Sequence, residues 1–219
     1  MMVSLKAKYK YEMTDSELET YVSKEEDQVI KKLKESLRPC VGVDAELEKL
    51  AEHKKYHLSV VSSSALRRVK ASIEKVGQDK FFDGERMSPS FLPFSPTFIP
   101  PSPHHKPIQL NTNDYVTPDV FSAATSLPKP TSKPDPAIYI HAMKVLGKTP
   151  EECVAVEDSK SGATAAFRAN IKTIGYTGSY EKSEEARMTK VLEDAGCVVV
   201  MKDWTEFEEA LGKIERGEV

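Results

Sequence analysis

Short apolar runs alternate with helix-like segments along most of this chain, and this alternation limits the folds open to it. Three strand-like runs occupy residues 153–156, 172–176 and 197–201, and a fourth ends at Ser62. Strand patterns that alternate with helical patterns are typical of a parallel sheet with helices on both faces. The predicted helices around these runs span residues 44–55, 65–76, 136–146, 161–169, 182–195 and 204–215. The sequence therefore predicts an α/β fold.

The first forty residues predict one more helix, which is amphipathic. The run Thr14-Asp15-Ser16-Glu17 has the pattern of a capping box, in which the hydroxyl and the carboxylate satisfy backbone amides at a helix start. The apolar residues that follow at helical spacing are Leu18, Val22, Val29, Ile30, Leu33 and Leu37.

Length and charge restrict the class of protein. The 219 residues suffice for one domain with a buried core, alone or with a small appendage. A net charge of -3 gives no overall basic field, so we predict neither nucleic acid nor a membrane as a partner. No apolar run approaches the roughly 20 residues that cross a bilayer, and the basic N-terminus does not resemble a signal peptide. We therefore expect a cytoplasmic protein.

The chain has three cysteines, Cys40, Cys153 and Cys197. Their number is odd and they form no cluster of the kind that binds a metal. Two of them lie in apolar, strand-like runs. We predict that all three are reduced thiols in the core.

Residues 84–119 interrupt the alternation. Proline fixes φ and removes a backbone donor, so this segment does not suit a regular element. Its prolines are Pro89, Pro93, Pro96, Pro100, Pro101, Pro103, Pro107 and Pro118. We predict a disordered insertion, with a lid or a proline-rich docking site as the alternatives. His104 and His105 belong to this segment and are not predicted as metal ligands.

Two adjacent carboxylates, Glu157 and Asp158, follow the run 153–156 and precede Ser159 and Gly162. Hard cations such as Mg²⁺ take oxygen ligands and keep several waters, so one or two carboxylates beside a phosphate can hold one. Ligands of open α/β sheets bind beyond the carboxyl ends of the strands. We therefore predict Glu157 and Asp158 as metal ligands. The plainer alternative is that the Asp-Ser pair only caps the following helix.

Two further groups suit phosphoryl transfer, which depends on positioning and on neutralising charge at the transferring oxygens. Ser62 and Ser63 lie between a strand and a predicted helix, where hydroxyl groups and backbone amides can bind a phosphate. Lys133, in the run Lys-Pro-Asp-Pro, can place a positive charge on the same phosphate. We predict all three as phosphate-binding residues, and Lys133 also as a catalytic residue.

In this order, the motifs resemble those of the haloacid dehalogenase superfamily. The resemblance is to subfamily I, which has a helical cap and includes phosphoglycolate phosphatases and β-phosphoglucomutases. Ser62 closes the run Leu-Ser-Val-Val and matches the family's Ser or Thr motif, Lys133 matches its lysine motif, and residues 154–159 match its acidic motif. The resemblance implies a Rossmann-like core, Mg²⁺ as the cofactor, and hydrolysis of a small phosphomonoester such as a sugar phosphate.

The resemblance also implies a division of the chain. Residues 1–38 correspond to part of the helical cap. The Rossmann-like core corresponds to residues 39–83 and 120–219, and the proline-rich residues 84–119 are inserted between its two parts.

One part of the family pattern is missing, because the sequence contains no Asp-x-Asp. Family catalysis begins with that pair on the first core strand, and covalent catalysis needs a positioned nucleophile. We expect that this strand is missing through N-terminal truncation, so the chain could be inactive as it stands. The alternative is a non-catalytic member that binds phosphate or a protein partner. A missing central strand leaves two strands with unpaired edges, which predicts marginal stability.

Overall fold

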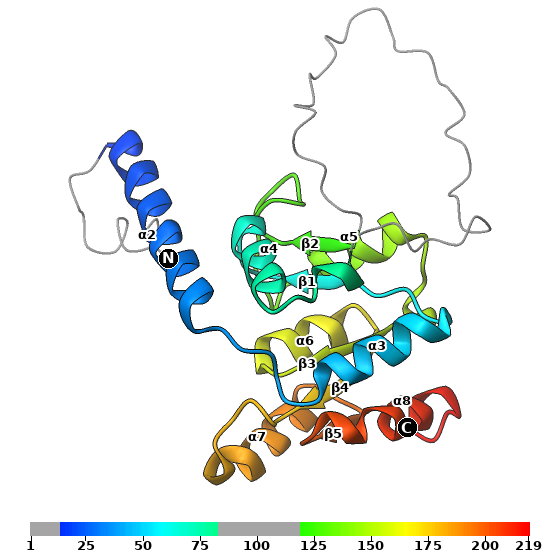
Figure 1. The fold of residues 1–219 in the computed structure, drawn as a ribbon. Helices are drawn as coiled ribbons and strands as arrows, with labels where there is room; N and C mark the ends of the chain where they lie inside the picture. Colours follow the sequence, from blue (N-terminus) through cyan, green and yellow to red (C-terminus); the bar gives the residue numbers. More distant parts are fainter. Residues whose placement is uncertain (1–13, 83–118) are drawn as a thin grey trace, which may run out of the picture.

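The computed structural model describes residues 14–82 and 119–219 (Figure 1). In chain order its α-helices are α2 (Asp15–Ser36), α3 (Val43–His53), α4 (Leu66–Lys75), α5 (Ala137–Leu146), α6 (Lys160–Arg168), α7 (Lys182–Asp194) and α8 (Phe207–Glu215). Its strands are β1 (Val60–Ser62), β2 (Val120–Ser122), β3 (Val154–Glu157), β4 (Lys172–Tyr176) and β5 (Val199–Met201). Its short 3₁₀ helices are η1 (Asp79–Phe81), η3 (Pro150–Glu152) and η4 (Trp204–Glu206).

The strands form two parallel sheets. β1 pairs with β2, and Val60 lies opposite Val120. β3, β4 and β5 form the second sheet with β4 in its centre. Within the described ranges β1 and β3 each pair on one side only, and Figure 1 shows them bordering the division between the sheets. The two unpaired edges expected from the sequence are therefore present.

Helices cover both faces of the strands, as the alternation predicted. α5, α6 and α7 share apolar clusters on one face, and α3, α4 and α8 share clusters on the other. α5 spans the division between the sheets, because Tyr139 packs in a cluster with Ala155 of β3 while Ile138 packs with Phe121 of β2.

α3 spans the same division on the opposite face. Leu47 packs against the cluster that contains Val120 of β2. Leu50 packs against the cluster that contains Ile174 of β4. The two sheets are thus joined by side chains of two helices rather than by a continuous backbone ladder.

Local sequence explains where several helices begin, end and pack. α2 starts with the predicted capping box, in which the Glu17 amide donates to Thr14 Oγ1 at 3.2 Å and the Thr14 amide donates to Glu17 Oε2 at 2.8 Å. α5 ends at Gly147, whose φ of 63° lies in the left-handed region that favours glycine. α6 packs closely because Ala163 and Ala166 are fully buried.

The sequence patterns missed one described strand, β2, and the short 3₁₀ helices. The three residues of β2 are all buried, but a run this short beside a proline-rich segment carries little periodicity. The predicted helices and the other strands are present with shifts of one to two residues at most ends, as boundary assignments commonly show. Most of the predicted insertion, residues 84–118, lies outside the described residues.

The prediction of three core cysteines was wrong for Cys40, which is exposed in the segment between α2 and α3. That segment is neither a strand nor part of a helix, and it runs along the surface. Cys153 is half-buried and Cys197 is buried, and all three are free.

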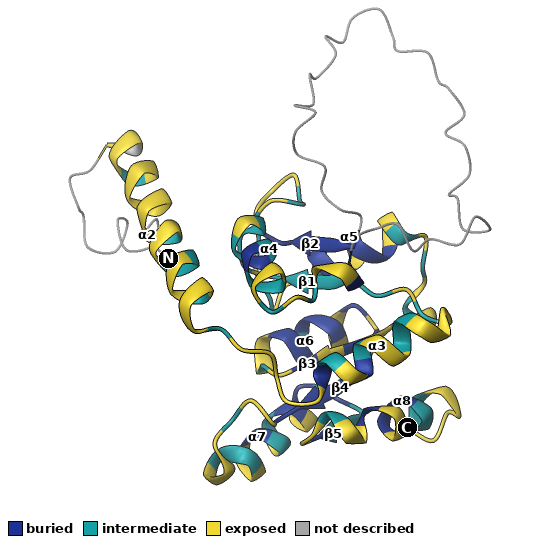
Figure 2. Cartoon of the chain, in the orientation of Figure 1, coloured by how far each residue is buried: buried dark blue, intermediate teal, exposed yellow. Residues whose placement is uncertain are grey.

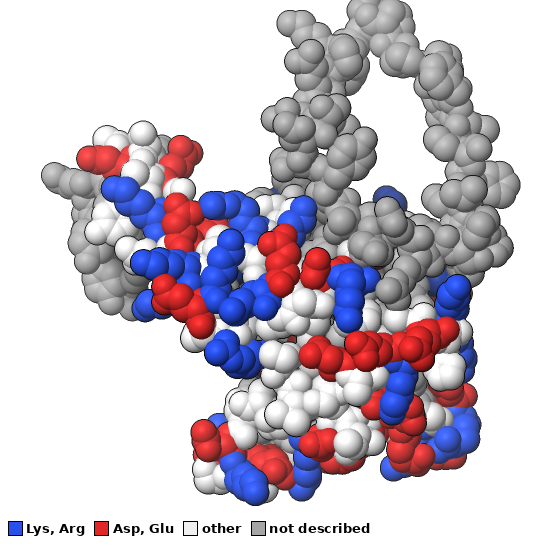
Figure 3. Space-filling model, viewed as in Figure 1, with Lys and Arg blue, Asp and Glu red and all other residues white. Residues whose placement is uncertain are grey.

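The charge distribution agrees with the small net charge. On the face drawn in Figure 3, basic and acidic side chains are interspersed over the described residues.

None of the described helices combines the length and the apolar composition needed to cross a bilayer.

Replacing Ile174 by Ala tests whether β4 is the centre of the core. Ile174 has no exposed surface, so we expect the free energy of unfolding to fall by about 2–5 kcal/mol through lost burial and a cavity. Urea denaturation monitored by circular dichroism measures the change. Val145, which is 47% exposed on α5, is the control, and Val145→Ala should cost no more than about 0.5 kcal/mol. Equal losses for the two variants would contradict this core.

Candidate functional site

The predicted site residues meet where the carboxyl ends of β1 and β3 approach each other. Ser62 is the last residue of β1 and Glu157 is the last residue of β3. Lys133 lies in the loop that precedes α5, and it reaches both strands. The structure therefore brings together residues that are far apart in the sequence.

Lys133 is the centre of this arrangement. Its ammonium donates to the Val61 carbonyl of β1 at 2.9 Å and forms an ion pair with Glu157 of β3. It also lies 3.3 Å from the Tyr139 hydroxyl and 4.8 Å from the centre of the Tyr139 ring. The side chains of Lys133 and Glu157 are only 11% and 8% exposed. A buried pair of this kind needs hydrogen-bond partners for its remaining atoms, and Val61 and Tyr139 supply them.

Tyr139 of α5 is a site residue that the sequence patterns did not identify. Its hydroxyl donates to the same Glu157 oxygen that Lys133 contacts. Burial, and then the nearby negative charge of Glu157, raise the pKa of Tyr139 well above its ordinary value. The phenol therefore stays protonated and remains a donor. No local signal marks it, because it lies among the other apolar residues of an inward helix face.

Ser63 fixes the backbone of Lys133. The Lys133 amide donates to Ser63 Oγ at 2.9 Å, which links the loop before α5 to the end of β1. Ser62 Oγ accepts from the Ser64 amide at 3.1 Å. Both hydroxyl oxygens are thus acceptors of backbone amides, and each hydroxyl hydrogen can still be donated to a ligand.

The adjacent carboxylates Glu157 and Asp158 have different environments. Alternate residues of a strand point to opposite sides, and Glu157 points inward with Ala155 while Asp158 is exposed. Gly162 of α6 makes room for the inward carboxylate, since a Cβ at that position would overlap it.

The helix cap at this point is Ser159. Its hydroxyl accepts from the Gly162 amide at 3.1 Å, while the Asp158 backbone carbonyl accepts from the Tyr180 hydroxyl at 2.9 Å. The capping alternative is therefore correct for the serine. It leaves the Asp158 carboxylate available for another role.

The Asp158 carboxylate has the chemistry of a ligand for a hard cation such as Mg²⁺. Carboxylate oxygens are ligands that Mg²⁺ prefers, and Mg²⁺ binds through one or two of them while it keeps waters and substrate oxygens. The Asp158 carboxylate is exposed, whereas one Glu157 oxygen is occupied by Lys133 and Tyr139. Within the part of the chain that the structure describes, no three His, Cys, Asp or Glu residues cluster as a metal site.

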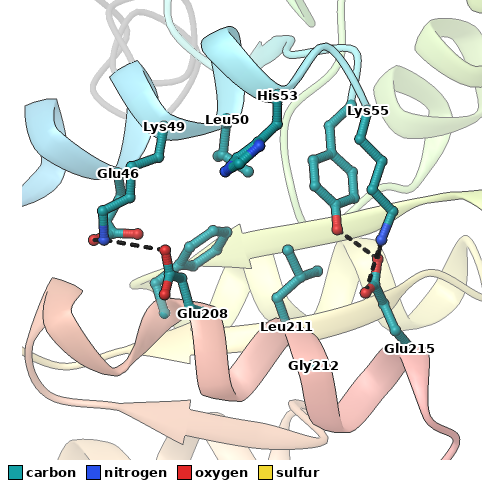
Figure 4. Close-up of a pocket in the computed structure, with 11 residues that line it drawn as sticks. Glu46, Lys49, Leu50, His53, Lys55, Glu208, Leu211, Gly212 and Glu215 are labelled. Atoms are coloured by element: carbon teal, nitrogen blue, oxygen red, sulfur yellow. Dashed lines mark hydrogen bonds and ion pairs between the residues drawn. The ribbon is translucent and has the colours of Figure 1, made fainter.

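A separate cavity of about 410 Å³ lies between α3 and α8 (Figure 4). None of the predicted site residues lines it. Lys49 forms ion pairs with Glu46 at 2.8 Å and Glu208 at 3.1 Å, and Lys55 pairs with Glu215 at 2.8 Å. The Lys49–Glu208 pair joins α3 to α8, and the Lys55–Glu215 pair joins the residues after α3 to the end of α8. The cavity is therefore a junction between these segments rather than the candidate site.

Comparison with known proteins bears directly on this site. The family model of the haloacid dehalogenase-like hydrolases matches residues 101–170, a segment that contains Lys133, Glu157 and Asp158. Over this segment the chain is similar to the haloacid dehalogenase-like hydrolases. The resemblance inferred from the sequence motifs is thereby confirmed.

Individual curated proteins match parts of the chain. The phosphoglycolate phosphatase of Psychrobacter arcticus is 33% identical over 87 residues, which are 37% of this chain and 37% of that protein. The phosphorylated carbohydrates phosphatase of Thermotoga maritima is 40% identical over 70 residues, which are 32% of this chain and 30% of that protein. The match thus spans well under half of the length of each relative.

A solved structure supports the fold over a longer range. A mutant of CbbY from Rhodobacter sphaeroides, in complex with xylulose-(1,5)-bisphosphate, superimposes with a TM-score of 0.57 at 21% identity. The superposition covers 88% of this chain and 67% of that one. The chain therefore has the haloacid dehalogenase-like, Rossmann-like fold.

Lys133→Met tests the buried ion pair. The substitution keeps the length of the side chain but leaves Glu157 buried without its counter-charge, so we expect a loss of about 3–5 kcal/mol in the free energy of unfolding. Lys190 pairs with Asp194 at 3.3 Å on the surface, and Lys190→Met should cost at most about 1 kcal/mol. Adding Glu157→Gln to Lys133→Met should recover part of the loss in urea denaturation. Equal costs for the two single variants would exclude a stabilising role for the pair.

Cysteine alkylation tests the packing behind Glu157. Burial, and then the charge of Glu157, raise the pKa of the Cys197 thiol to about 12. Because only the thiolate is nucleophilic, iodoacetamide at mildly alkaline pH should spare Cys197 in the native protein and label the exposed Cys40. Peptide mass spectrometry measures both sites, and denaturation before labelling is the control. Native labelling of Cys197 at the rate of Cys40 would contradict the packing.

Proposed function

We propose that this chain supplies the phosphate-binding and Mg²⁺-binding part of a haloacid dehalogenase-type phosphohydrolase that acts on a small phosphomonoester such as a sugar phosphate. The observation that carries the proposal is the position of the Lys133 ammonium, which lies between Val61 of β1 and Glu157 of β3 at the carboxyl ends of both strands. That end is where open α/β sheets bind their ligands.

In this proposal Lys133 neutralises charge on the phosphate oxygens. Its longest hydrogen bond is the 3.3 Å contact with the Tyr139 hydroxyl, and a phosphate oxygen can replace that contact while the links to Val61 and Glu157 persist. Ser62 and Ser63 would donate their hydroxyl hydrogens to the same phosphate. Such positioning and charge neutralisation are the main protein contributions to phosphoryl transfer.

Asp158 is the proposed direct ligand of Mg²⁺, and Glu157 is proposed to support the site from the protein side. Bound Mg²⁺ would neutralise negative charge on phosphate oxygens. Glu157 has a second role, because it holds Lys133 and so couples the position of the phosphate-binding ammonium to the metal site.

The proposed substrate class rests on the names of the similar proteins. Two of them are named as phosphatases, of phosphoglycolate and of phosphorylated carbohydrates, and the CbbY structure is a complex with a sugar bisphosphate. All three ligands are small and carry a phosphate ester, which is the chemistry that a lysine, hydroxyl groups and Mg²⁺ would recognise.

One observation favours a second candidate, a non-catalytic phosphate-binding or partner-binding member of the family. The sequence contains no Asp-x-Asp, and the matched motifs offer no other positioned carboxylate nucleophile, which covalent catalysis requires. Binding and turnover therefore have to be measured separately.

The test is calorimetric titration of the 219-residue chain with inorganic phosphate, with and without Mg²⁺. We expect Mg²⁺ to strengthen phosphate binding, and Asp158→Asn to remove that effect with a loss of about tenfold or more in Mg²⁺ affinity. Asp194→Asn, a change of the same type at the last residue of α7, should leave binding unchanged.

Turnover decides between the two candidates. Mg²⁺-dependent release of phosphate from a generic phosphomonoester, lost in Asp158→Asn, would support the hydrolase. Mg²⁺-dependent phosphate binding with no release would support the non-catalytic member. Phosphate binding that is unaffected by Mg²⁺ and by Asp158→Asn would contradict the proposed Mg²⁺ site and the hydrolase, and absence of phosphate binding would contradict the proposed roles of Lys133, Ser62 and Ser63.

A further inference from the structure

The segment between β4 and α7 reaches the candidate site. β4 ends at Tyr176 and α7 begins at Lys182, and Figure 2 shows β4 largely buried while the connecting residues are mostly exposed. In this segment the Tyr180 hydroxyl donates to the backbone carbonyl of Asp158 at 2.9 Å. Asp158 is the proposed direct ligand of Mg²⁺, so this contact bears on the geometry of the metal site.

Asp158 lies at a junction between two regular elements. β3 ends at Glu157 and the cap of α6 is Ser159, so the Asp158 carbonyl lies outside both the strand and the helix. That carbonyl belongs to the planar peptide group that joins Asp158 to Ser159. A hydrogen bond to its oxygen therefore restricts rotation about the Asp158 Cα–C bond, and with it the direction in which the side chain leaves the backbone.

The two neighbouring carboxylates are held in different ways. Lys133 and Tyr139 both contact the carboxylate of Glu157. The Asp158 carboxylate is exposed, and within residues 14–82 and 119–219 no hydrogen bond or ion pair restrains it. The protein thus fixes Glu157 through its side chain and Asp158 through its backbone.

The turn that carries Tyr180 is itself fixed to the sheet. The Tyr180 amide donates to the Thr177 carbonyl at 3.0 Å, which closes a four-residue turn. Thr177 is fully buried, and its amide donates at 3.0 Å to the carbonyl of Met201, the last residue of β5. Gly178 lies so close to the Lys202 carbonyl that a Cβ would overlap it. The Tyr180 hydroxyl is therefore presented from a backbone that the core holds in place.

The phenol of Tyr180 is suited to be a donor. Burial, and then the negative charge of Asp158, raise the pKa of Tyr180 above its ordinary value, while Arg187 acts in the opposite direction. The hydroxyl therefore stays protonated at neutral pH and can donate to the carbonyl.

We propose that Tyr180 is a positioning residue for Mg²⁺, because it holds the Asp158 backbone so that the exposed carboxylate is directed at the cation. The role rests on the proposed function, in which Asp158 is the ligand, and Tyr180 itself does not touch the cation. Replacing a residue that supports a metal ligand lowers metal affinity by about 10- to 100-fold. Tyr180 acts through the backbone, so we expect a loss at the lower end of that range.

The choice of cation separates positioning from a general effect on the site. Mg²⁺ demands near-ideal octahedral geometry, whereas Ca²⁺ accepts a larger and more variable set of oxygen ligands. A displaced carboxylate should therefore weaken Mg²⁺ binding more than Ca²⁺ binding. A change that only loosens the fold, or only alters the local charge, would weaken the binding of both cations alike.

Tyr180→Phe tests the proposal, since it keeps the ring and removes only the hydroxyl. Calorimetric titrations of the 219-residue chain with Mg²⁺ alone and with Ca²⁺ alone measure the two affinities. We expect the Mg²⁺ affinity to fall by about tenfold and the Ca²⁺ affinity by no more than about threefold. The affinity for inorganic phosphate without Mg²⁺ should stay unchanged.

Tyr56→Phe is the matched control. The Tyr56 hydroxyl also donates to an oxygen, that of the Glu215 carboxylate, but it lies at the cavity between α3 and α8. Removal of this hydroxyl should leave both cation affinities at the wild-type values. Urea denaturation monitored by circular dichroism verifies that each variant is folded under the titration conditions.

Asp158→Asn distinguishes failure of the positioning role from failure of the proposed function. If Asp158→Asn lowers the Mg²⁺ affinity and Tyr180→Phe does not, the metal site stands and the role of Tyr180 is excluded. Equal losses of Mg²⁺ and Ca²⁺ affinity in Tyr180→Phe, or an equal loss of Mg²⁺ affinity in Tyr56→Phe, would also overturn that role. If wild type does not bind Mg²⁺, or Asp158→Asn binds it unchanged, the proposed metal site fails and the positioning role fails with it.

Discussion

The contact of the Lys133 ammonium with two strands is the interaction on which the candidate site depends. The described strands form two sheets, so no backbone hydrogen bonds between strands join β1 to β3. Lys133 makes that connection, because it donates to the Val61 carbonyl of β1 and pairs with Glu157 of β3. The same group that joins the sheets is the positive charge that the proposed phosphate needs.

The burial that makes this contact strong comes from the helices. α5 packs across both sheets on one face and carries Tyr139, which shares Glu157 with Lys133. α3 packs across both sheets on the other face. If α5 moved, Tyr139 would leave Glu157 and Lys133, water would reach the ion pair, and the pair would weaken. The geometry of the site is therefore a consequence of apolar packing some distance from the charged atoms.

The adjacent carboxylates Glu157 and Asp158 have different environments because successive side chains at a strand's end point to opposite sides. Glu157 points inward and is neutralised by Lys133, whereas Asp158 is exposed, where a cation can reach it. Gly162 and Ser159 complete this separation, one by leaving space for the inward carboxylate and the other by capping α6. The acidic motif thus combines a structural residue with a candidate ligand, which residue types alone do not distinguish.

The sequence by itself determined the helices, four of the five described strands and the resemblance to the haloacid dehalogenase-like hydrolases. It also indicated five candidate site residues, because periodicity, caps and short motifs are local properties of the chain. Only the tertiary structure decided that the strands divide into two sheets, that Tyr139 belongs to the site, and that Cys40 is exposed. These features depend on contacts between residues far apart in the sequence, and no local pattern records such contacts.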